Sequence, residues 1–414
     1  MGSSAASSPT RSASASRSPS ARACSRSSRS SSPSPSPRCA ASAPTGRRLT
    51  TEAPPVLRLA LVALVLALAA GCTGEREESC GEDAEAAAPP TERSDAPAFR
   101  ILWLGDTLFA DAAEPHLVSN GYAWAFDGLR PLPDADYVVA NAEGPITTET
   151  AVYDPSQPWS YAARPEAALA LAVEGVSAVG LANNHALDRG PAGLADTIAH
   201  LAAAGVVTFG AGTDIDEALR PLLVETPHGR VGVVAFGQGD GVRENAGEGR
   251  PGVAVLTRCN AAEGAHLARD AGARWLVAFV HWGVNYGEVT HAQRRQAGLL
   301  AEAGYGLTIG HGPHIAQPVE VVDGMPVLYS LGNFVFGTPG RFTADAPGFG
   351  LMATTAFGPA GLEELRLHCI RSDNDEVAFQ PRPCSPAEAD AALRAVHADI
   401  VVEDGVGMLR WPIR

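Results

Sequence analysis

The sequence contains no lysine, few aromatic residues and only one long apolar run. Aromatic residues make up 6% of the 414 residues, whereas 43 glycines and 32 prolines indicate many turns between elements rich in small side chains. A collagen, a coiled coil and a polytopic membrane protein are excluded, because Gly-X-Y periods, sustained heptads and further apolar runs are missing. The length suffices for one large domain, or two small ones, with a sizeable core.

The positive charge is supplied by arginine and is concentrated at the N-terminus. Residues 1–71 hold nine Arg and one Glu, a net charge of +8, which leaves −23 for the remainder of a chain whose formal charge is −15. Nonspecific nucleic-acid binding depends on basic side chains that neutralise phosphates. We therefore expect no nucleic-acid partner.

Residues 1–97 are predicted to precede the folded domain of residues 98–414. Residues 1–50 are almost entirely Ser, Ala, Pro and Arg, so disorder is expected. Within residues 51–72, a basic flank and the run LALVALVLALAAGC are typical of an export signal. The AAGC ending resembles a lipobox and predicts an exported lipoprotein, membrane-anchored through Cys72 at the cell surface or in the periplasm. A signal-anchor helix and simple secretion are the alternatives. Residues 73–97 read as an acidic linker.

The cysteines lack the CxxC spacing of metal sites. Four follow the predicted lipidation site, namely Cys80, Cys259, Cys369 and Cys384. An exported compartment permits disulfides, and a bond between Cys369 and Cys384 could close a C-terminal loop. The sequence does not decide the pairing.

From residue 99, short apolar runs alternate with Ala- and Leu-rich helical segments, which predicts an α/β domain. Five of these runs lead to a side chain of the metal-ligating type. These side chains are Asp106, Glu143, Asn184 with His185, His281, and His311 with His314. In open α/β sheets the functional crevice lies outside the carboxyl ends of the strands. We therefore expect these residues to converge on one site.

A helix is predicted directly after the third of these runs. Pro191 suits its first turn, Leu194 and Leu201 share a face, and Gly205 ends it. Asn184, His185 and Asp188 then lie in the turn from strand to helix, at the mouth of the sheet.

The expected site offers carboxylate, amide and imidazole groups without thiolates. Such a set is unlike a structural Cys-type zinc site and suits Mn, Fe or Zn better than Mg or Ca. Two such ions bridged by a carboxylate would stabilise the attacking and leaving oxygens of a phosphoester.

The chain resembles the bacterial CapA family, the poly-γ-glutamate capsule synthesis proteins, over residues 99–357. The stretches that carry the resemblance are ILWLGD, ANAEGP, GLANNHALDRGPAGLADTIAHLAAAGVVTFGAG, FVHWGVNYG, IGHGPHIAQPVE and PVLYSLGNFVFG. The resemblance implies the fold of calcineurin-like metallophosphoesterases, in which two packed mixed β-sheets are flanked by helices in an α/β/β/α sandwich.

The resemblance also implies roles for single residues. Asp106, Glu143, Asn184, His281, His311 and His314 fall on metal-ligand positions, with Glu143 as the bridging carboxylate. His185 falls on the histidine that assists the leaving group, oriented by Asp188. Leu108 and Gly312 stand where such proteins commonly have histidines. The site could therefore hold two ions, one ion or no metal.

Two further residues are candidates for substrate contact. Trp282 follows His281 in a glycine-containing loop, and it could wall the cleft or pack in the core. Asn333 in PVLYSLGNFVF could touch substrate or satisfy a turn. We read this stretch as a buried strand pair, and the C-terminal hairpin around GPAG as completing the second sheet.

Three functions compete. The first is a surface factor in making or attaching an anionic envelope polymer such as poly-γ-glutamate, with a membrane synthase or export complex as partner. The second is a metal-dependent hydrolase of the phosphoesterase type, acting on an exported phosphorylated small molecule. The third is a metal-free binding module of the same fold.

Overall fold

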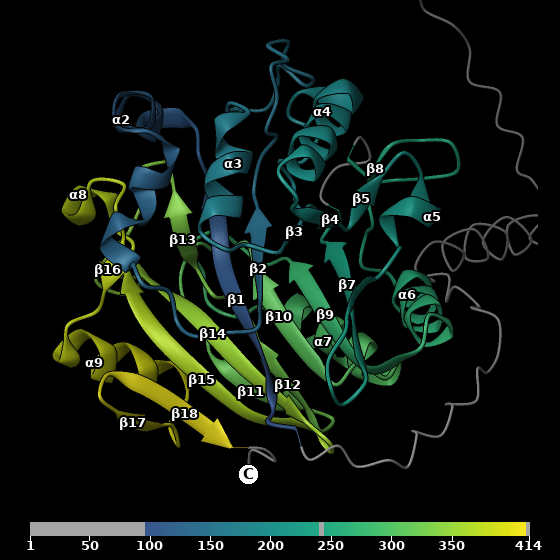
Figure 1. Ribbon diagram of the computed structural model, residues 1–414, viewed down its shortest axis with the longest axis vertical. Helices are drawn as coiled ribbons and strands as arrows, with labels where there is room; N and C mark the ends of the chain where they lie inside the picture. Colours follow the sequence, from purple (N-terminus) through teal and green to yellow (C-terminus); the bar gives the residue numbers. More distant parts are fainter. Residues whose placement is uncertain (1–95, 240–243, 411–414) are drawn as a thin grey trace, which may run out of the picture. The chain divides into compact units, whose positions relative to one another are not determined.

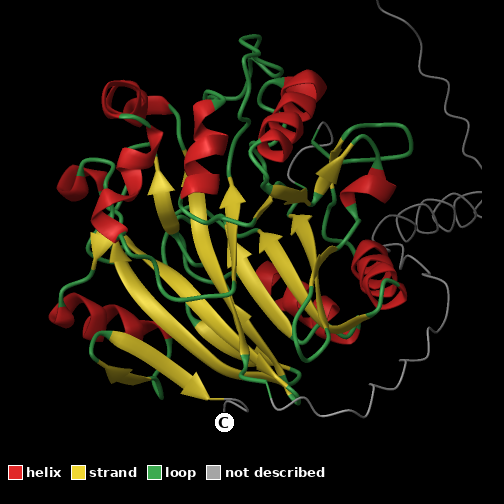
Figure 2. Cartoon of the chain, in the orientation of Figure 1, coloured by secondary structure: helices red, strands yellow, loops and turns green. Residues whose placement is uncertain are grey.

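Two mixed β-sheets stacked face to face, with helices outside each, make up the computed structural model, which describes residues 96–239 and 244–410 (Figures 1 and 2). The arrangement confirms the predicted α/β/β/α fold class. The predicted disordered segment, the signal sequence, Cys72 and almost all of the linker lie outside the described residues. No helix in the described ranges is long and apolar enough to cross a membrane.

The larger sheet carries the first half of the predicted site. Among the described residues its strand order is β17-β18-β15-β14-β1-β2-β3-β4, with β13 beside β1 and β16 beside β15. Its strands are β1 (Phe99–Leu108), β2 (Tyr137–Ala142), β3 (Ala178–Gly180), β4 (Val207–Phe209), β13 (Asn333–Phe336), β14 (Phe349–Gly358), β15 (Gly361–Arg371), β16 (Arg382–Pro383), β17 (Val401–Glu403) and β18 (Val406–Arg410). Strands β1 to β4 are parallel, so their carboxyl ends share one edge.

The smaller sheet carries the other half, in the order β11-β12-β10-β9-β7-β6. Its strands are β6 (Leu222–Val224), β7 (Arg230–Gly237), β9 (Ala273–His281), β10 (Leu307–His311), β11 (Val319–Val322) and β12 (Met325–Leu328). Strands β7, β9, β10 and β12 are parallel. A short ribbon pairs β5 (Ala211–Gly212) with β8 (Gly252–Val253).

Helices cover the outer face of each sheet (Figure 2). Those on the larger sheet include α3 (Glu166–Val173), α4 (Gly190–Ala203) and α9 (Pro386–Val396), whereas α6 (Arg258–Asp270) and α7 (His291–Glu302) cover the smaller one. Shorter elements are η1 (Asp111–Ala113), α2 (Glu114–Asn120), η2 (Tyr122–Leu129), α5 (Ile215–Ala218) and α8 (Asn374–Val377). Helix α4 matches the helix predicted after Asp188.

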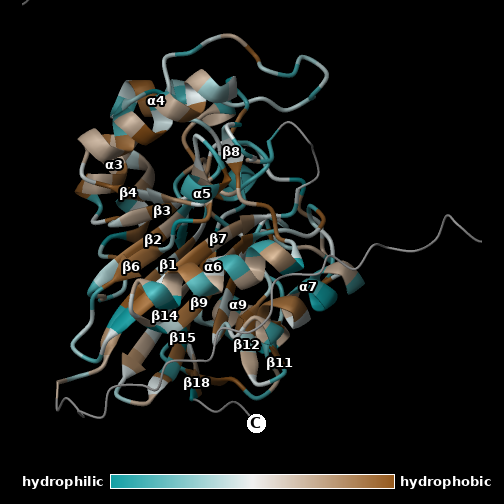
Figure 3. Ribbon diagram, turned by 90° about the vertical axis from the view of Figure 1, so that its right-hand side faces the viewer, coloured by the Kyte–Doolittle hydropathy of each residue, from teal (hydrophilic) through white to brown (hydrophobic). Residues whose placement is uncertain are grey.

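The smaller sheet is buried on both faces, which explains its continuous apolar runs. Along β9, Val277 and Phe279 pack towards the larger sheet, while Ala278 and Val280 pack towards α6 and α7. The ring of Phe279 lies 6.3 Å from that of Trp103 in β1. The hydropathy of the ribbon shows the same pattern, because the central strands are its most hydrophobic part (Figure 3).

Two predictions about the C-terminal part are wrong in detail. The stretch 326–336 is buried, but β12 pairs with β10 and β13 pairs with β1, so the two strands belong to different sheets and form no pair. The hairpin of β14 and β15 forms as predicted around residues 359–360, yet β14 pairs with β1 and extends the first sheet. Local sequence patterns specify a strand but not its partner strand, because pairing depends on packing between segments that are far apart in the sequence.

The structure contains the disulfide Cys369–Cys384, and Cys259 is disulfide-bonded as well. Replacing Cys369 and Cys384 together by serine is expected to lower the free energy of unfolding by about 3 kcal/mol, because the bond closes a loop with a sequence separation of 15. Urea unfolding of the variant and the wild type measures this difference. Coincident unfolding curves would contradict the expectation.

Candidate metal centre

The predicted site residues meet where the carboxyl ends of the two sheets come together. Asp106 lies near the end of β1, Glu143 directly follows β2, and His281 and His311 are the last residues of β9 and β10. His314 follows in the next turn. Ligand atoms of Asp106, Glu143 and His314 all lie within 4.8 Å of one another, and the three residues are buried. The predicted convergence is therefore confirmed for these three residues.

One oxygen of Glu143 is the focus of the cluster. The Nε2 atoms of His314, His281 and His185 lie 3.8, 3.9 and 4.0 Å from Glu143 Oε1. These distances exceed hydrogen-bond length. Among the described atoms, Glu143 Oε2 is buried without a hydrogen-bond partner. The imidazoles surround the carboxylate without hydrogen bonding to it. This arrangement suits a set of ligands that bind one cation between them.

Asp106 is held rigidly beside Glu143. Its backbone N–H donates to the Gly332 carbonyl at 3.0 Å, and the Gly312 N–H donates to its Oδ2 at 3.1 Å. The Asn141 amide donates to Oδ1 at 2.7 Å. Both sheets therefore contribute to the position of this carboxylate, which is completely buried.

The side-chain amides of Asn183 and Asn141 are hydrogen-bonded in a chain that determines the tautomer of His281. Backbone groups orient Asn183, because its Oδ1 accepts from the His185 N–H and its Nδ2 donates to the Ala142 carbonyl. Nδ2 of Asn183 also lies 3.2 Å from Asn141 Oδ1, so Asn141 Nδ2 faces His281 Nδ1 at 3.2 Å. Nδ1 of His281 therefore accepts, and the proton of the neutral ring lies on Nε2, towards Glu143. A role for His281 as a metal ligand stays a prediction.

His314 is oriented differently from His281. Its Nδ1 lies 3.0 Å from Asn333 Oδ1 and 3.5 Å from Asp106 Oδ2, both acceptors. The Nδ1 proton is therefore directed at these oxygens, and Nε2 faces Glu143 as a metal-ligating histidine would. The backbone of His314 is left-handed, with φ 62°. Such a conformation is strained for a side chain larger than glycine and is common at functional sites.

Burial and neighbouring charge together set the ionisation of the cluster. Burial raises the pKa of Glu143 well above its ordinary value. Burial also tends to raise the pKa of Asp106, but contacts with His311 and His314 outweigh this and hold it well below its usual range. Burial by itself lowers the pKa of His314, and the Glu143 and Asp106 carboxylates reverse the effect and raise it to about 9. Burial lowers the pKa of His281 to about 3, so this ring is neutral.

The donors present fit a divalent transition metal. His311 is completely buried with Nδ1 3.4 Å from Asp106 Oδ1, and neither ring nitrogen has a hydrogen-bond partner among the described atoms. Buried polar groups without partners are rare in proteins and call for an explanation. Two carboxylates with several imidazoles and no thiolate suit Mn, Fe or Zn.

The two positions that lack histidine are occupied by Leu108 and Gly312. Leu108 is buried in the core, 2% exposed. At Gly312, which has φ 109°, an added Cβ would lie 2.5 Å from the Trp282 carbonyl oxygen. Among the described His, Cys, Asp and Glu residues, the group that could hold a metal is that of Asp106, Glu143 and His314.

His185 and Asp188 form a dyad at the edge of this group. His185 Nδ1 lies 2.9 Å from Asp188 Oδ2, which also accepts the Tyr161 backbone N–H at 2.6 Å. The Tyr161 ring packs against the imidazole, with centroids 4.6 Å apart. Asp188 thus fixes the Nδ1 proton and leaves Nε2 directed at Glu143.

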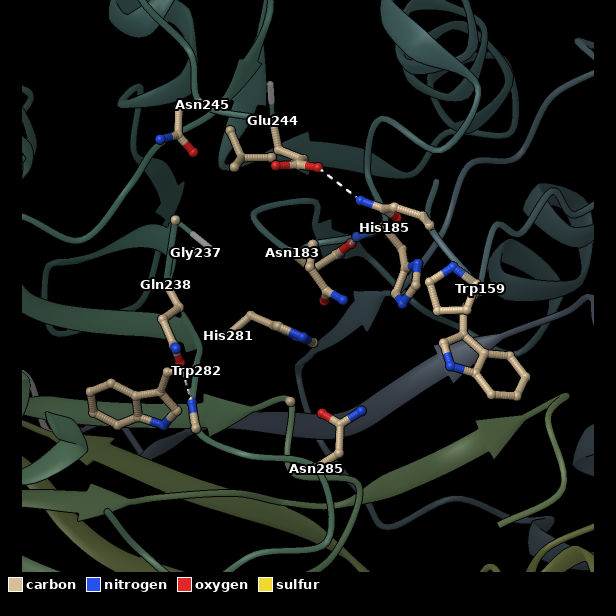
Figure 4. Close-up of a pocket in the computed structure, with 17 residues that line it drawn as sticks. Trp159, Asn183, His185, Gly237, Gln238, Glu244, Asn245, His281, Trp282 and Asn285 are labelled. Carbon is tan, nitrogen blue, oxygen red and sulfur yellow. Dashed lines mark hydrogen bonds between the residues drawn. The ribbon is translucent and has the colours of Figure 1, made fainter. Parts of the chain in front are cut away.

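A cavity of about 260 Å³ opens beside His185, His281 and Gly312 (Figure 4). Asn184 lines it with an exposed side chain, whereas Asn183 is the amide bonded into the centre. Trp282 also lines it, but its indole is buried, packs at a tilt against the Tyr329 ring and donates to the Tyr329 carbonyl at 2.8 Å. Asn333 is buried and contacts His314.

Sequence reasoning missed Asn141 and Tyr161. Asn141 is a polar residue in the otherwise apolar strand YVVANA, and that exception was the available signal. Tyr161 lies in a loop of irregular sequence, and nothing in its surroundings indicated contact with His185.

Fold and site together define an α/β/β/α protein with a buried carboxylate–imidazole centre suited to a divalent metal. Residues 100–338 match the family described as bacterial capsule synthesis protein PGA_cap, and the chain belongs to that family.

Curated relatives and a solved structure are similar to this chain. The PGA biosynthesis protein CapA of Bacillus subtilis (strain 168) is 27% identical over 59% of this chain and 65% of its own length. The capsule biosynthesis protein CapA of Bacillus anthracis is 27% identical over 63% of this chain and 65% of its own length. The chain thus spans just under two thirds of these relatives. The calcineurin-like phosphoesterase YfkN from Bacillus subtilis is 13% identical, covering 70% of this chain and 90% of that chain with a TM-score of 0.36.

Proposed function

We propose that this protein acts at the cell envelope in the synthesis or attachment of poly-γ-glutamate or a related anionic polymer, through hydrolysis at a divalent-metal site. The observation that carries the proposal is the convergence of Asp106, Glu143 and His314, buried beside an open cavity. Family membership and the names of the two CapA relatives support the choice of polymer.

Asp106, Glu143 and His314 would hold the metal, with His311 beside them. A bound divalent ion would activate water and neutralise charge on substrate oxygens. In its doubly protonated form, His185 would donate the Nε2 proton to the leaving group, because Asp188 binds its Nδ1 and its Nε2 faces the centre. Asn333 and Asn141 position His314 and Asp106.

The location and partners that we propose rest on the N-terminal sequence and on the family resemblance. An export signal ending at Cys72 supports an exported lipoprotein whose lipid anchors it to the membrane. A membrane synthase or export complex is the expected protein partner. A phosphorylated small molecule is the alternative substrate, favoured by the dyad of His185 and Asp188, which suits ester hydrolysis.

Replacing His185 by alanine is expected to separate chemistry from metal binding. We expect the purified wild type to bind at least one Mn, Fe or Zn ion per chain and to hydrolyse poly-γ-glutamate or p-nitrophenyl phosphate. The variant should keep the metal and lose about 100-fold or more in rate, the contribution of a general acid. Metal analysis and rate measurements on both polymer and phosphoester give the readout.

His266→Ala is the matched control, because His266 is an exposed helix residue paired with Asp270. It should behave as wild type. A wild type that takes up no metal after reconstitution would contradict the proposal and favour a metal-free binding module. Hydrolysis of the phosphoester alone would favour the phosphorylated small molecule.

A further inference from the structure

The cavity beside the centre is walled by side chains of one kind. Carboxamides line it from separate segments of the chain, together with one carboxylate, two imidazoles and two indoles. They include Gln157, Trp159, Asn184, Glu244, Asn245 and Asn285. Figure 4 shows Trp159 and Asn285 on one side, Glu244 and Asn245 on the other, and His185 and His281 between them. A ligand of the cavity therefore lies beside His185 and His281, at the edge of the candidate metal centre.

The wall disfavours an anion. The described residues that line the cavity include no arginine, and the chain has no lysine. Glu244 instead contributes a carboxylate, whose Oε1 accepts from Gln157 Nε2 at 3.1 Å. A carboxylate or phosphate placed against Glu244 would be desolvated beside a like charge, with no arginine among the described lining residues to pair with it.

The wall suits a ligand rich in hydroxyl groups. A carboxamide offers both a donor and an acceptor, and a carboxylate accepts from two hydroxyls. Asn245 Oδ1 is buried with no hydrogen-bond partner among the described atoms. Asn285 is exposed at the rim. Each of these groups can bond a hydroxyl or an acetamido group.

Trp159 adds an apolar surface to this polar wall. Its side chain is 48% exposed, unlike most large apolar side chains of the chain. A pyranose ring has a C–H face that packs on an indole and a rim of hydroxyls that bonds amides. The volume of about 260 Å³ is below that of pockets for drug-sized ligands and matches one ring rather than a polymer segment.

The loop that carries Trp159 is fixed before any ligand binds. The Tyr153 N–H donates to the Asp188 carbonyl at 3.0 Å, and Arg189 donates to the Ser160 hydroxyl at 2.5 Å. Both hydrogen bonds are made to the turn that carries the His185–Asp188 dyad. They therefore fix the position of the Trp159 indole relative to the candidate metal centre. Such preorganisation reduces the entropic cost of binding.

We propose that this cavity binds an uncharged sugar ring, the unit to which the substrate polymer is joined. This inference rests on the proposed function, because the cavity opens beside the metal centre that the proposed function requires. The polymer's charged part would then lie outside the cavity, and the ring would present its linkage to His185.

Titration of the full-length protein with triacetylchitotriose tests this inference, with a γ-glutamate trimer and adenosine as comparison ligands. We expect the trisaccharide to bind, and Trp159→Ala to weaken it by about tenfold or more. Asn285→Ala should weaken it as well. Val152→Ala is the matched control, because Val152 is exposed on the same loop and does not line the cavity. Thermal unfolding confirms that each variant is folded.

Three results would overturn the inference: no binding of the trisaccharide, tighter binding of the γ-glutamate trimer or adenosine, or equal affinity in the Trp159 variant. The measurement is repeated after chelation. Sugar binding that survives removal of metal supports the cavity as a sugar-binding site, even if the metal-dependent hydrolysis is refuted. Metal binding without sugar binding leaves the proposed function in place and removes this inference.

Discussion

Glu143→Gln is expected to leave the protein folded and to lower its affinity for metal by at least about 100-fold. Glutamine has nearly the same shape, and among the described atoms Glu143 Oε2 has no hydrogen-bond partner that the substitution would remove. The substitution takes away the charge and an oxygen donor at the point where three imidazoles meet. Competition with a fluorescent chelator for Mn or Zn measures the change.

Glu149→Gln provides the matched control. Glu149 is an exposed residue six positions further along the same segment, and it stands outside the cluster. It should bind metal as the wild type does. Wild-type affinity in the Glu143 variant, with the same unfolding midpoint, would show that Glu143 is not a ligand and would remove the basis of the metal-dependent function.

Gly105→Ala is expected to destabilise the protein by about 3 kcal/mol or more and to abolish metal binding. A Cβ at this position would lie 2.1 Å from the Gly332 carbonyl oxygen. That carbonyl accepts the Asp106 N–H, and β13 follows it with Asn333, the partner of His314. Relief of the clash has to move β13 away from β1, which separates Asp106 from His314.

Gly298→Ala tests whether the effect depends on this close approach. Gly298 lies in α7, and a Cβ there would meet no atom within 4 Å. Alanine should therefore stabilise the helix by roughly 0.5–1 kcal/mol. Urea unfolding and metal content are measured for both variants. A Gly105 variant that unfolds like the wild type would contradict the argument that the approach of β13 holds the site together.

Much of the candidate site was predictable because each candidate ligand follows a recognisable apolar run. A strand buried on both faces has to be apolar, so a carboxylate or imidazole at its end stands out. The rule that crevices form at the carboxyl ends of parallel strands then brings Asp106, Glu143 and His281 together. The rule holds here across two sheets, because their parallel strands end at a common edge.

Other features were beyond local patterns. Asn183 and Asn184 are neighbours of the same type and both line the cavity, yet Asn183 is buried and bonded to Asn141, whereas Asn184 is exposed. Only the direction of each side chain at the end of β3 separates them. The residues of the cavity wall were equally unpredictable from the sequence, since Gln157, Glu244 and Asn285 lie in loops without periodicity.

The sequence by itself determined the α/β class, the helix after Asp188 and the residue types that gather at the strand ends, because these depend on local propensity and on the period of apolar residues. Tertiary structure alone decided that β12 and β13 enter different sheets, that Asn141 orients Asp106 and His281, and that uncharged amides wall the cavity. These features depend on contacts between distant segments, whose free energy is set by packing and by the pairing of buried polar groups.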